Sequence, residues 1–128
     1  MMNRINIPAN TKWAEIVGYS RAVRIGNMIE VAGTAAVDDD GSIVGETAYE
    51  QTKFILQKIE KALNDAHATL NDVVRTRIFV KDISQWEAIG RAHGEFFKGI
   101  NPVTTMVEVS GFIATELMVE IEVTAIIS

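Results

Sequence analysis

Three glutamates stand at alternating positions in two apolar runs near the C-terminus. Glu108 lies in NPVTTMVEV (residues 101–109), and Glu120 and Glu122 lie in LMVEIEVTAII (residues 117–127). This alternation predicts β-strands whose successive side chains point to opposite faces of a sheet, so the glutamates share one face. Carboxylates crowded on one face repel one another, and such crowding raises the pKa of a carboxyl group. A carboxyl group with a raised pKa is a candidate for proton transfer.

The sheet face that carries these glutamates is predicted to be polar across four strands. Its predicted members are Glu30, Thr34, Arg75, Arg77, Thr104, Met106, Glu108, Glu120 and Glu122. Antiparallel sheets commonly leave one such face in water. Both basic residues are arginines, which are favoured in interfacial ion pairs because the planar guanidinium can hold a carboxylate with two hydrogen bonds. A solvated face and a face that meets another subunit therefore both remain open.

The elements that position these residues begin with a hairpin and a helix. Residues 19–25 and 28–36 alternate as strands around the two-residue hairpin signal Gly-Asn. Thr47 and Glu50 form a capping-box pair, and apolar residues at helical spacing continue from there to about His67. The first half of the chain thus predicts two antiparallel strands followed by an amphipathic helix.

A third strand, a second helix and the two glutamate-bearing strands follow. The strand is predicted over residues 73–81, and Ser84 with Glu87 forms a second capping-box pair that opens a helix ended by Gly99. The element order is β-β-α-β-α-β-β, without a linker or a repeat. We predict an α+β fold with two helices on one face of a mixed sheet, as a single domain over residues 1–128.

Composition narrows the class of protein and of partner. The 128 residues are 48% hydrophobic, which is enough for a core, and the net charge of −5 gives no general electrostatic reason to bind nucleic acid. The chain has no cysteine and two histidines, so we expect no disulfide and no metal site. No run approaches the roughly 20 apolar residues of a membrane span, and the first residues lack the apolar core of a secretory signal. We expect a soluble cytoplasmic protein with a small-molecule or protein partner.

Six segments, in their order and spacing, carry a family resemblance. They are GYSRAVRIGN at 18–27, VAGT at 31–34, VVRTRIFVKD at 73–82, EFF at 95–97, NPVTTMVEV at 101–109 and VEIEVTA at 119–125. Together they resemble the RidA/YjgF family of small enamine/imine deaminases over essentially the whole chain. The resemblance implies a chorismate-mutase-like α+β fold, assembled as a homotrimer whose sheets line a central barrel with three clefts between subunits.

The resemblance also implies a reaction and its residues. Family members hydrolyse 2-imino acids, formed from enamines such as 2-aminoacrylate, to 2-oxo acids and ammonia without a metal or an organic cofactor. Tyr19 matches the tyrosine that lines the family's cleft, and Glu120 matches its glutamate. We predict that these two residues are catalytic; for Glu120, a salt bridge to Arg75 or Arg77 within the sheet is the alternative.

This sequence departs from the family pattern where an arginine usually holds the substrate carboxylate. Thr104 stands at the arginine position and Met106 at the position of the usual cysteine. Ala32, before Gly33, replaces the usual serine, and Gly90 replaces an asparagine often found in the second helix. A threonine offers one neutral hydrogen bond in place of two charge-assisted ones. The ligand therefore lacks that carboxylate, or another base reaches it.

Other residues are weighed for binding. Arg21 lies two residues from Tyr19, on the same strand face, and is the candidate for the missing base; an ion pair at the surface or between subunits is the alternative. His93, on the apolar side of the second helix, is interpreted as a packed or interface histidine rather than a general base. The predicted substrate-binding residues are Thr104, Thr105, Met106, Gly33, Thr34 and Arg21.

Three functions follow from these residues. The first is a homotrimeric deaminase or related hydrolase that acts on an atypical small metabolite through Glu120 and Tyr19. The second is a metabolite-binding trimer without catalysis. Ribonuclease activity, often attached to this family by name, is the weakest of the three because the chain is acidic.

Overall fold

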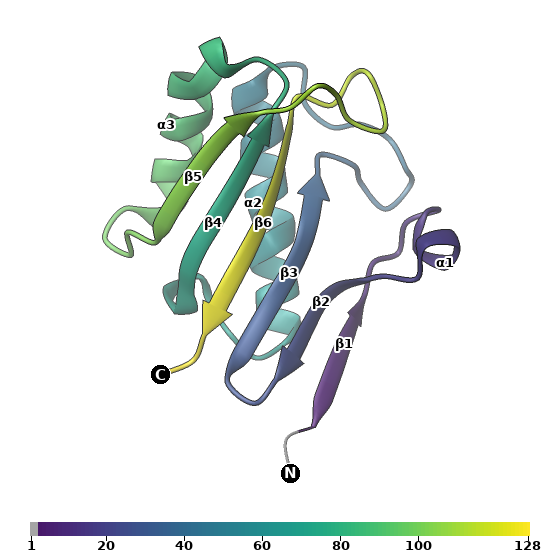
Figure 1. Cartoon of the computed structure of the whole chain (residues 1–128), viewed down its shortest axis with the longest axis vertical. Helices are drawn as coiled ribbons and strands as arrows, with labels where there is room; N and C mark the ends of the chain where they lie inside the picture. Colours follow the sequence, from purple (N-terminus) through teal and green to yellow (C-terminus); the bar gives the residue numbers. More distant parts are fainter. Residues whose placement is uncertain (1–2) are drawn as a thin grey trace.

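A computed structural model describes residues 3–128 as one six-stranded sheet with its two long helices on one face (Figure 1). The elements are β1 (Arg4–Pro8), α1 (Ala14–Val17), β2 (Ser20–Ile25), β3 (Met28–Ala35), α2 (Ala48–Asp65), η1 (Leu70–Asp72), β4 (Val73–Val80), η2 (Ile83–Gln85), α3 (Trp86–Phe97), β5 (Val103–Glu108) and β6 (Val119–Ile126). The strand order is β1-β2-β3-β6-β4-β5, with only the β4–β5 pair parallel. The predicted α+β fold with a mixed sheet is confirmed.

The N-terminal strands confirm one prediction and add an element. Ile25 pairs with Met28 across the Gly-Asn turn, as the hairpin signal predicts. The segment Arg4–Pro8, interpreted from the sequence as a polar start, instead forms β1 against β2. It has only five residues, and Pro8 is tolerated because β1 is an edge strand.

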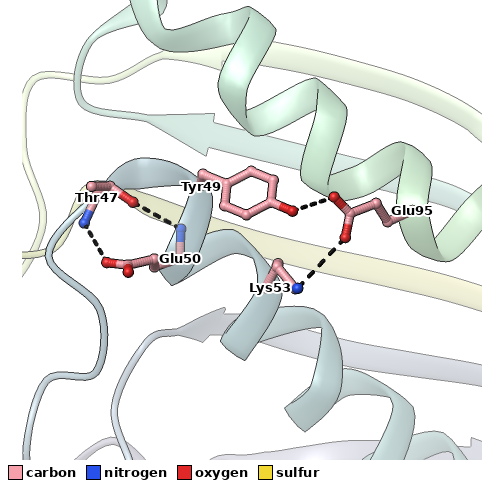
Figure 2. Close-up of polar contacts among 5 residues, drawn as sticks. All are labelled: Thr47, Tyr49, Glu50, Lys53 and Glu95. Carbon is pink, nitrogen blue, oxygen red and sulfur yellow. Dashed lines mark hydrogen bonds and ion pairs between the residues drawn. The ribbon is translucent and has the colours of Figure 1, made fainter.

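The two predicted capping boxes have opposite outcomes. At α2 the box is confirmed, because Thr47 Oγ1 accepts from the Glu50 amide at 3.1 Å and Glu50 Oε1 accepts from the Thr47 amide at 3.2 Å (Figure 2). The box predicted at Ser84 is wrong. The Ser84 hydroxyl donates to Asp82, which caps the η2 turn ahead of α3, and Glu87 pairs with Arg91.

A polar contact holds α3 in place against α2. The Tyr49 hydroxyl on α2 donates to the Glu95 carboxylate on α3, and Lys53 Nζ lies 3.6 Å from the other Glu95 oxygen (Figure 2).

Register shifts change which residues face the helices. A shift in β3 between Val31 and Thr34 turns Thr34 into the core, where it is fully buried. A shift in β4 between Val73 and Arg75 buries Val73 and leaves Val74 41% exposed. We call the sheet face opposite the helices the open face. The prediction that Thr34 lies on this face is therefore wrong.

The predicted face of β5 is also wrong. Thr104 pairs with Thr76 and Met106 with Ile78, so both lie on the helix side of the sheet. Glu108 accepts a hydrogen bond from the Ile83 amide at the η2 turn. The open face of β5 carries Val103, Thr105 and Val107, next to the open face of β4 that carries Arg75 and Arg77.

Within residues 3–128, the helices are too short or too polar to span a lipid bilayer.

Candidate functional site

A cavity of about 310 Å³ opens at the end of the sheet where β2 and β6 begin and β3 ends. We call it the glutamate pocket. Its walls come from β2, β3, β6, the segment around α1 and the loop that precedes β6. The lining residues are Thr11, Trp13, Tyr19, Arg21, Ala32, Gly33, Ala35, Val37, Ile113, Leu117 and Glu120. Four sequence-predicted site residues, Tyr19, Arg21, Gly33 and Glu120, are therefore brought together.

Glu120 lies directly over Gly33. A Cβ atom added at Gly33 would stand 2.4 Å from Glu120 Oε1, which is closer than two such atoms can approach. The register shift in β3 falls at this position. A larger residue at position 33 would therefore displace the Glu120 carboxyl group from this place over β3.

The carboxyl group of Glu120 is half-buried without an ion pair among residues 3–128. Its pKa is raised above the ordinary 4.5, first by burial and then by the charge of Glu122, while the charge of Arg21 opposes the rise. The salt bridge considered from the sequence forms elsewhere, since Arg77 Nη1 lies 3.1 Å from Glu122 Oε1. Glu120 is thus available for proton transfer in the pocket.

Arg21 and Tyr19 form the wall beside Glu120. The Arg21 guanidinium carbon lies 5.7 Å from the centre of the Tyr19 ring, and Tyr19 Oη is 2.6 Å from Thr11 Oγ1. Arg21 Nη1 donates to the Gly33 carbonyl and to Thr34 Oγ1, both at 3.0 Å. Arg21 is only 8% exposed, and its recorded hydrogen bonds use Nη1 alone, so Nε and Nη2 are not committed within residues 3–128.

A second polar group lies on the other side of the sheet. Thr76 Oγ1 on β4 is 2.9 Å from His93 Nε2 on α3 and 2.9 Å from Thr104 Oγ1 on β5. The Thr104 hydroxyl also donates to the Pro102 carbonyl at 3.2 Å. We call Thr76, His93 and Thr104 the threonine–histidine chain.

The threonine–histidine chain is uncharged and partly open to solvent. Thr76 is fully buried, whereas Thr104 is exposed at the edge strand. Burial lowers the pKa of His93 below its ordinary 6.5, and its ring packs against Phe97 with 4.6 Å between centroids. The packed histidine expected from the sequence is present, but its hydrogen-bond partner was not predicted.

The two groups lie on opposite faces of the sheet in one chain. Glu120 pairs with Phe79 on the open face, and Thr104 pairs with Thr76 on the helix face, with β4 between β5 and β6. The structure thus separates Thr104 and Met106 from the glutamate pocket. Thr105, on the open face, and Thr34, in the core, also lie outside the residues that line it.

A larger cavity contains none of the sequence-predicted site residues. It measures about 700 Å³ and lies near the N-terminal ends of α2 and α3. Lys81 is its one lysine, and its carboxylates are Glu46, Asp82 and Glu116. Its size exceeds that of the glutamate pocket, but it lacks the half-buried, unpaired carboxyl group that makes Glu120 a candidate for chemistry.

The chain is similar to a group of small proteins over most of its length. A sequence model of the family described as "Endoribonuclease L-PSP" matches residues 10–127. A RutC family protein of Pyrococcus abyssi is 35% identical over 84% of each chain. The 3-aminoacrylate deaminase RutC of Acinetobacter baylyi is 28% identical over 94% of this chain and 95% of that one. The crystal structure of Rv2704 of Mycobacterium tuberculosis, a YjgF/YER057c/UK114 family member, has a TM-score of 0.90 and 46% identity, covering 98% of this chain and 100% of that one.

Proposed function

This chain belongs to the endoribonuclease L-PSP family, the YjgF group that its sequence resembles, and we propose that it hydrolyses an imine or enamine of a small metabolite at the glutamate pocket. The observation that carries the proposal is the Glu120 carboxyl group, half-buried over Gly33 with a raised pKa and no ion pair within residues 3–128. The name of the A. baylyi relative, a 3-aminoacrylate deaminase, supports the enamine class.

The reaction needs one group that first takes a proton and then returns it. The imine nitrogen is protonated, so as the water oxygen bonds to the imine carbon the water gives one proton to the Glu120 carboxylate and the carbon–nitrogen double bond becomes the single bond of a neutral aminoalcohol. Glu120 returns that proton to the nitrogen, the carbon–nitrogen bond breaks, and the hydroxyl proton passes to the departing ammonia, which leaves as ammonium while the carbonyl forms. A pKa raised toward neutrality suits both steps, because the same group must act as base and as acid.

Tyr19 and Arg21 supply the polar wall for the substrate. The Tyr19 hydroxyl, held by Thr11, is placed to orient the attacking water or the leaving nitrogen. The Arg21 guanidinium faces the same cavity and provides a positive charge there, with Nε and Nη2 as the donors not committed within residues 3–128. In this proposal Arg21 takes part of the role that an arginine at position 104 would have.

The same reasoning supports a homotrimer. Thr104 and Glu120 cannot meet in one chain, but the β5 edge of one subunit could lie against the glutamate pocket of the next. The open face also carries apolar side chains that another subunit would cover, among them Val103 at 56% and Val107 at 42% exposure. We propose that three copies close this face and form the clefts between them.

Ammonia release from freshly generated 2-imino acids tests the reaction. Glu120→Gln keeps the shape of the side chain but cannot exchange the proton, so turnover should fall by about 100-fold or more. Glu122→Gln is the matched control two residues along the same strand, and it should keep most of the turnover because burial, the largest cause of the raised pKa of Glu120, is unchanged. Unchanged turnover in Glu120→Gln would refute the catalytic role.

The mass in solution tests the assembly. Light scattering should give about three times the 14.1 kDa of one chain. A mass of one chain at micromolar concentration would remove the inter-subunit cleft and leave the glutamate pocket as the whole site.

One observation favours a binding protein without catalysis. The position that usually carries the carboxylate-binding arginine holds Thr104, whose hydroxyl is engaged with Thr76 and Pro102. Saturable binding of a small 2-oxo compound with no ammonia release from any imine would support this second function over the first.

A further inference from the structure

We propose that Thr76 and His93 orient the Thr104 hydroxyl as a single neutral donor, so that the ligand presents an uncharged carbonyl oxygen, such as that of a carboxamide, at this position. The proposal concerns specificity and deepens the proposed function, since it rests on Thr104 lining the cleft. His93 and Thr76 are positioning residues, and Thr104 is the residue that contacts the ligand.

Counting hydrogens gives the threonine–histidine chain a direction. A threonine hydroxyl has one hydrogen to donate, and a backbone carbonyl can only accept. If the Thr104 hydroxyl donates to the Pro102 carbonyl, it has no hydrogen left for Thr76, and Thr76 donates across the 2.9 Å contact between the two threonines. In this arrangement, which we propose, Thr76 has no hydrogen left for His93, and His93 Nε2–H donates to Thr76.

This direction decides what Thr104 can offer a ligand. Its oxygen accepts from Thr76, and its hydrogen makes the longest of the three bonds, 3.2 Å to Pro102. A ligand oxygen can take over that hydrogen at little cost because Thr104 is exposed. The opposite direction, in which Thr104 donates to Thr76, would leave Thr104 able only to accept from a ligand.

Because the threonine–histidine chain is uncharged, it favours an uncharged group on the ligand. His93 has no ion pair within residues 3–128, and burial disfavours its charged form. The remaining partners are two hydroxyls and the Pro102 carbonyl. A carboxylate brought here would lose water and gain one neutral hydrogen bond, whereas a carboxamide or ketone oxygen loses less solvation for the same bond.

The first test determines, without any ligand, which groups donate the hydrogen bonds of the threonine–histidine chain. Nitrogen-15 NMR of the imidazole rings distinguishes the two neutral tautomers, and His67→Gln identifies His93, since the chain has two histidines. The natural protein at neutral pH should show His93 as the neutral Nε2–H form. A hydrogen on Nδ1, or a charged ring, would overturn the proposal.

The second test compares pyruvamide with pyruvate, which differ in a carboxamide and a carboxylate. Binding followed through the Thr104 methyl resonance should be about tenfold tighter for pyruvamide. Thr104→Arg should reverse the preference. Thr76→Val should remove it by depriving Thr104 of its donor, and Thr76→Ser should keep it.

Equal binding, tighter binding of pyruvate, or no binding of either probe would overturn the proposal. Neither test measures turnover, so a failure of the deaminase reaction and a failure of this inference give different results. A protein that prefers pyruvamide but releases no ammonia would retain the inference and lose the reaction.

Discussion

The glutamate pocket and the threonine–histidine chain differ in charge although the same physical effect acts on both. Burial disfavours the charged form of an ionisable group, so it raises the pKa of the acid Glu120 and lowers that of the base His93. Glu120 also feels the opposing charge of Arg21, whereas desolvation is the only cause of the His93 shift. The glutamate pocket therefore contains a carboxyl group that can gain or lose a proton, and the threonine–histidine chain contains a histidine that stays neutral.

This difference suggests a division of labour within the proposed cleft. Proton transfer needs a group that changes charge, which the glutamate pocket supplies through Glu120. Recognition of an uncharged group needs donors and acceptors in fixed directions, which the threonine–histidine chain supplies. Changes that act on one region should leave the other intact, and that separation can be tested.

Among variants that keep the Glu120 carboxyl group, the largest effect should come from Gly33→Ala, which alters the glutamate pocket alone. The added Cβ would overlap Glu120 Oε1, so the carboxyl group must move. We expect turnover to fall by about 100-fold, because a displacement of about 1 Å costs that much, and stability to change by less than about 1 kcal/mol, because the flexible end of the Glu120 side chain can shift at little cost. Imine turnover and urea unfolding measure the two effects.

Gly90→Ala is the matched control on the other region. A Cβ at Gly90 meets nothing within 4 Å, and the residue lies inside α3. Alanine should therefore stabilise the protein by about 0.5–1 kcal/mol and preserve turnover. If both alanine variants behave alike, the close approach of β3 to Glu120 has no functional consequence.

A smaller effect should follow Thr76→Val, which breaks the threonine–histidine chain alone. Valine keeps the shape but leaves the half-buried His93 Nε2 without its hydrogen-bond partner, at a cost of about 1–3 kcal/mol. Thr105→Val, on the exposed open face of β5, should change the free energy of unfolding by less than about 0.5 kcal/mol. Urea unfolding of both variants at one protein concentration checks the contrast; equal values would mean that water replaces Thr76 as the partner of His93.

Much of the fold could be predicted because local signals agreed with it. The Gly-Asn hairpin and the Thr47–Glu50 box each depend on residues close in sequence, and both formed as predicted. Alternation also grouped the residues of β5 correctly, but it could not say which group faces the helices. On an edge strand Val103 and Val107 remain exposed, so the more apolar group was wrongly assigned to the core.

The site was less predictable because it depends on register and on contacts distant in sequence. Thr34 changed face at a register shift that alternation does not encode. The meeting of Tyr19 with Glu120 was expected only through the family resemblance. A signal for the threonine–histidine chain existed, since Thr76 is a lone polar residue on the apolar side of β4 and a buried hydroxyl needs a partner. The sequence could not show that His93 on α3 would supply it.

A pH-dependent effect, smaller than the substitutions above, should distinguish Glu120 within the pocket. Its pKa is higher in the folded chain, so folding binds a proton more tightly and stability is greatest below the unfolded value of about 4.5. The free energy of unfolding, relative to Glu120→Gln, should fall as the pH rises from about 4.5 through the folded pKa. Urea unfolding between pH 4 and 8 checks this, and a difference that does not vary with pH would place the carboxyl group in water.

The smallest effect should be the opposite pH dependence of His93. Its pKa is lower in the folded chain, so the unfolded chain binds the proton more tightly and stability falls as the pH drops below about 6.5. The free energy of unfolding, relative to His93→Gln, should be constant above that pH and decrease below it until the folded pKa is reached. Loss of ring packing against Phe97 only offsets the variant by an amount independent of pH. Measurements at a fixed chain concentration keep any subunit equilibrium constant, and His67→Gln controls for the exposed histidine. If the difference in free energy of unfolding between the two proteins does not change between pH 7.5 and 5, the His93 ring is accessible enough to take up a proton freely. The contrast between an ionisable glutamate pocket and an uncharged threonine–histidine chain would then no longer hold.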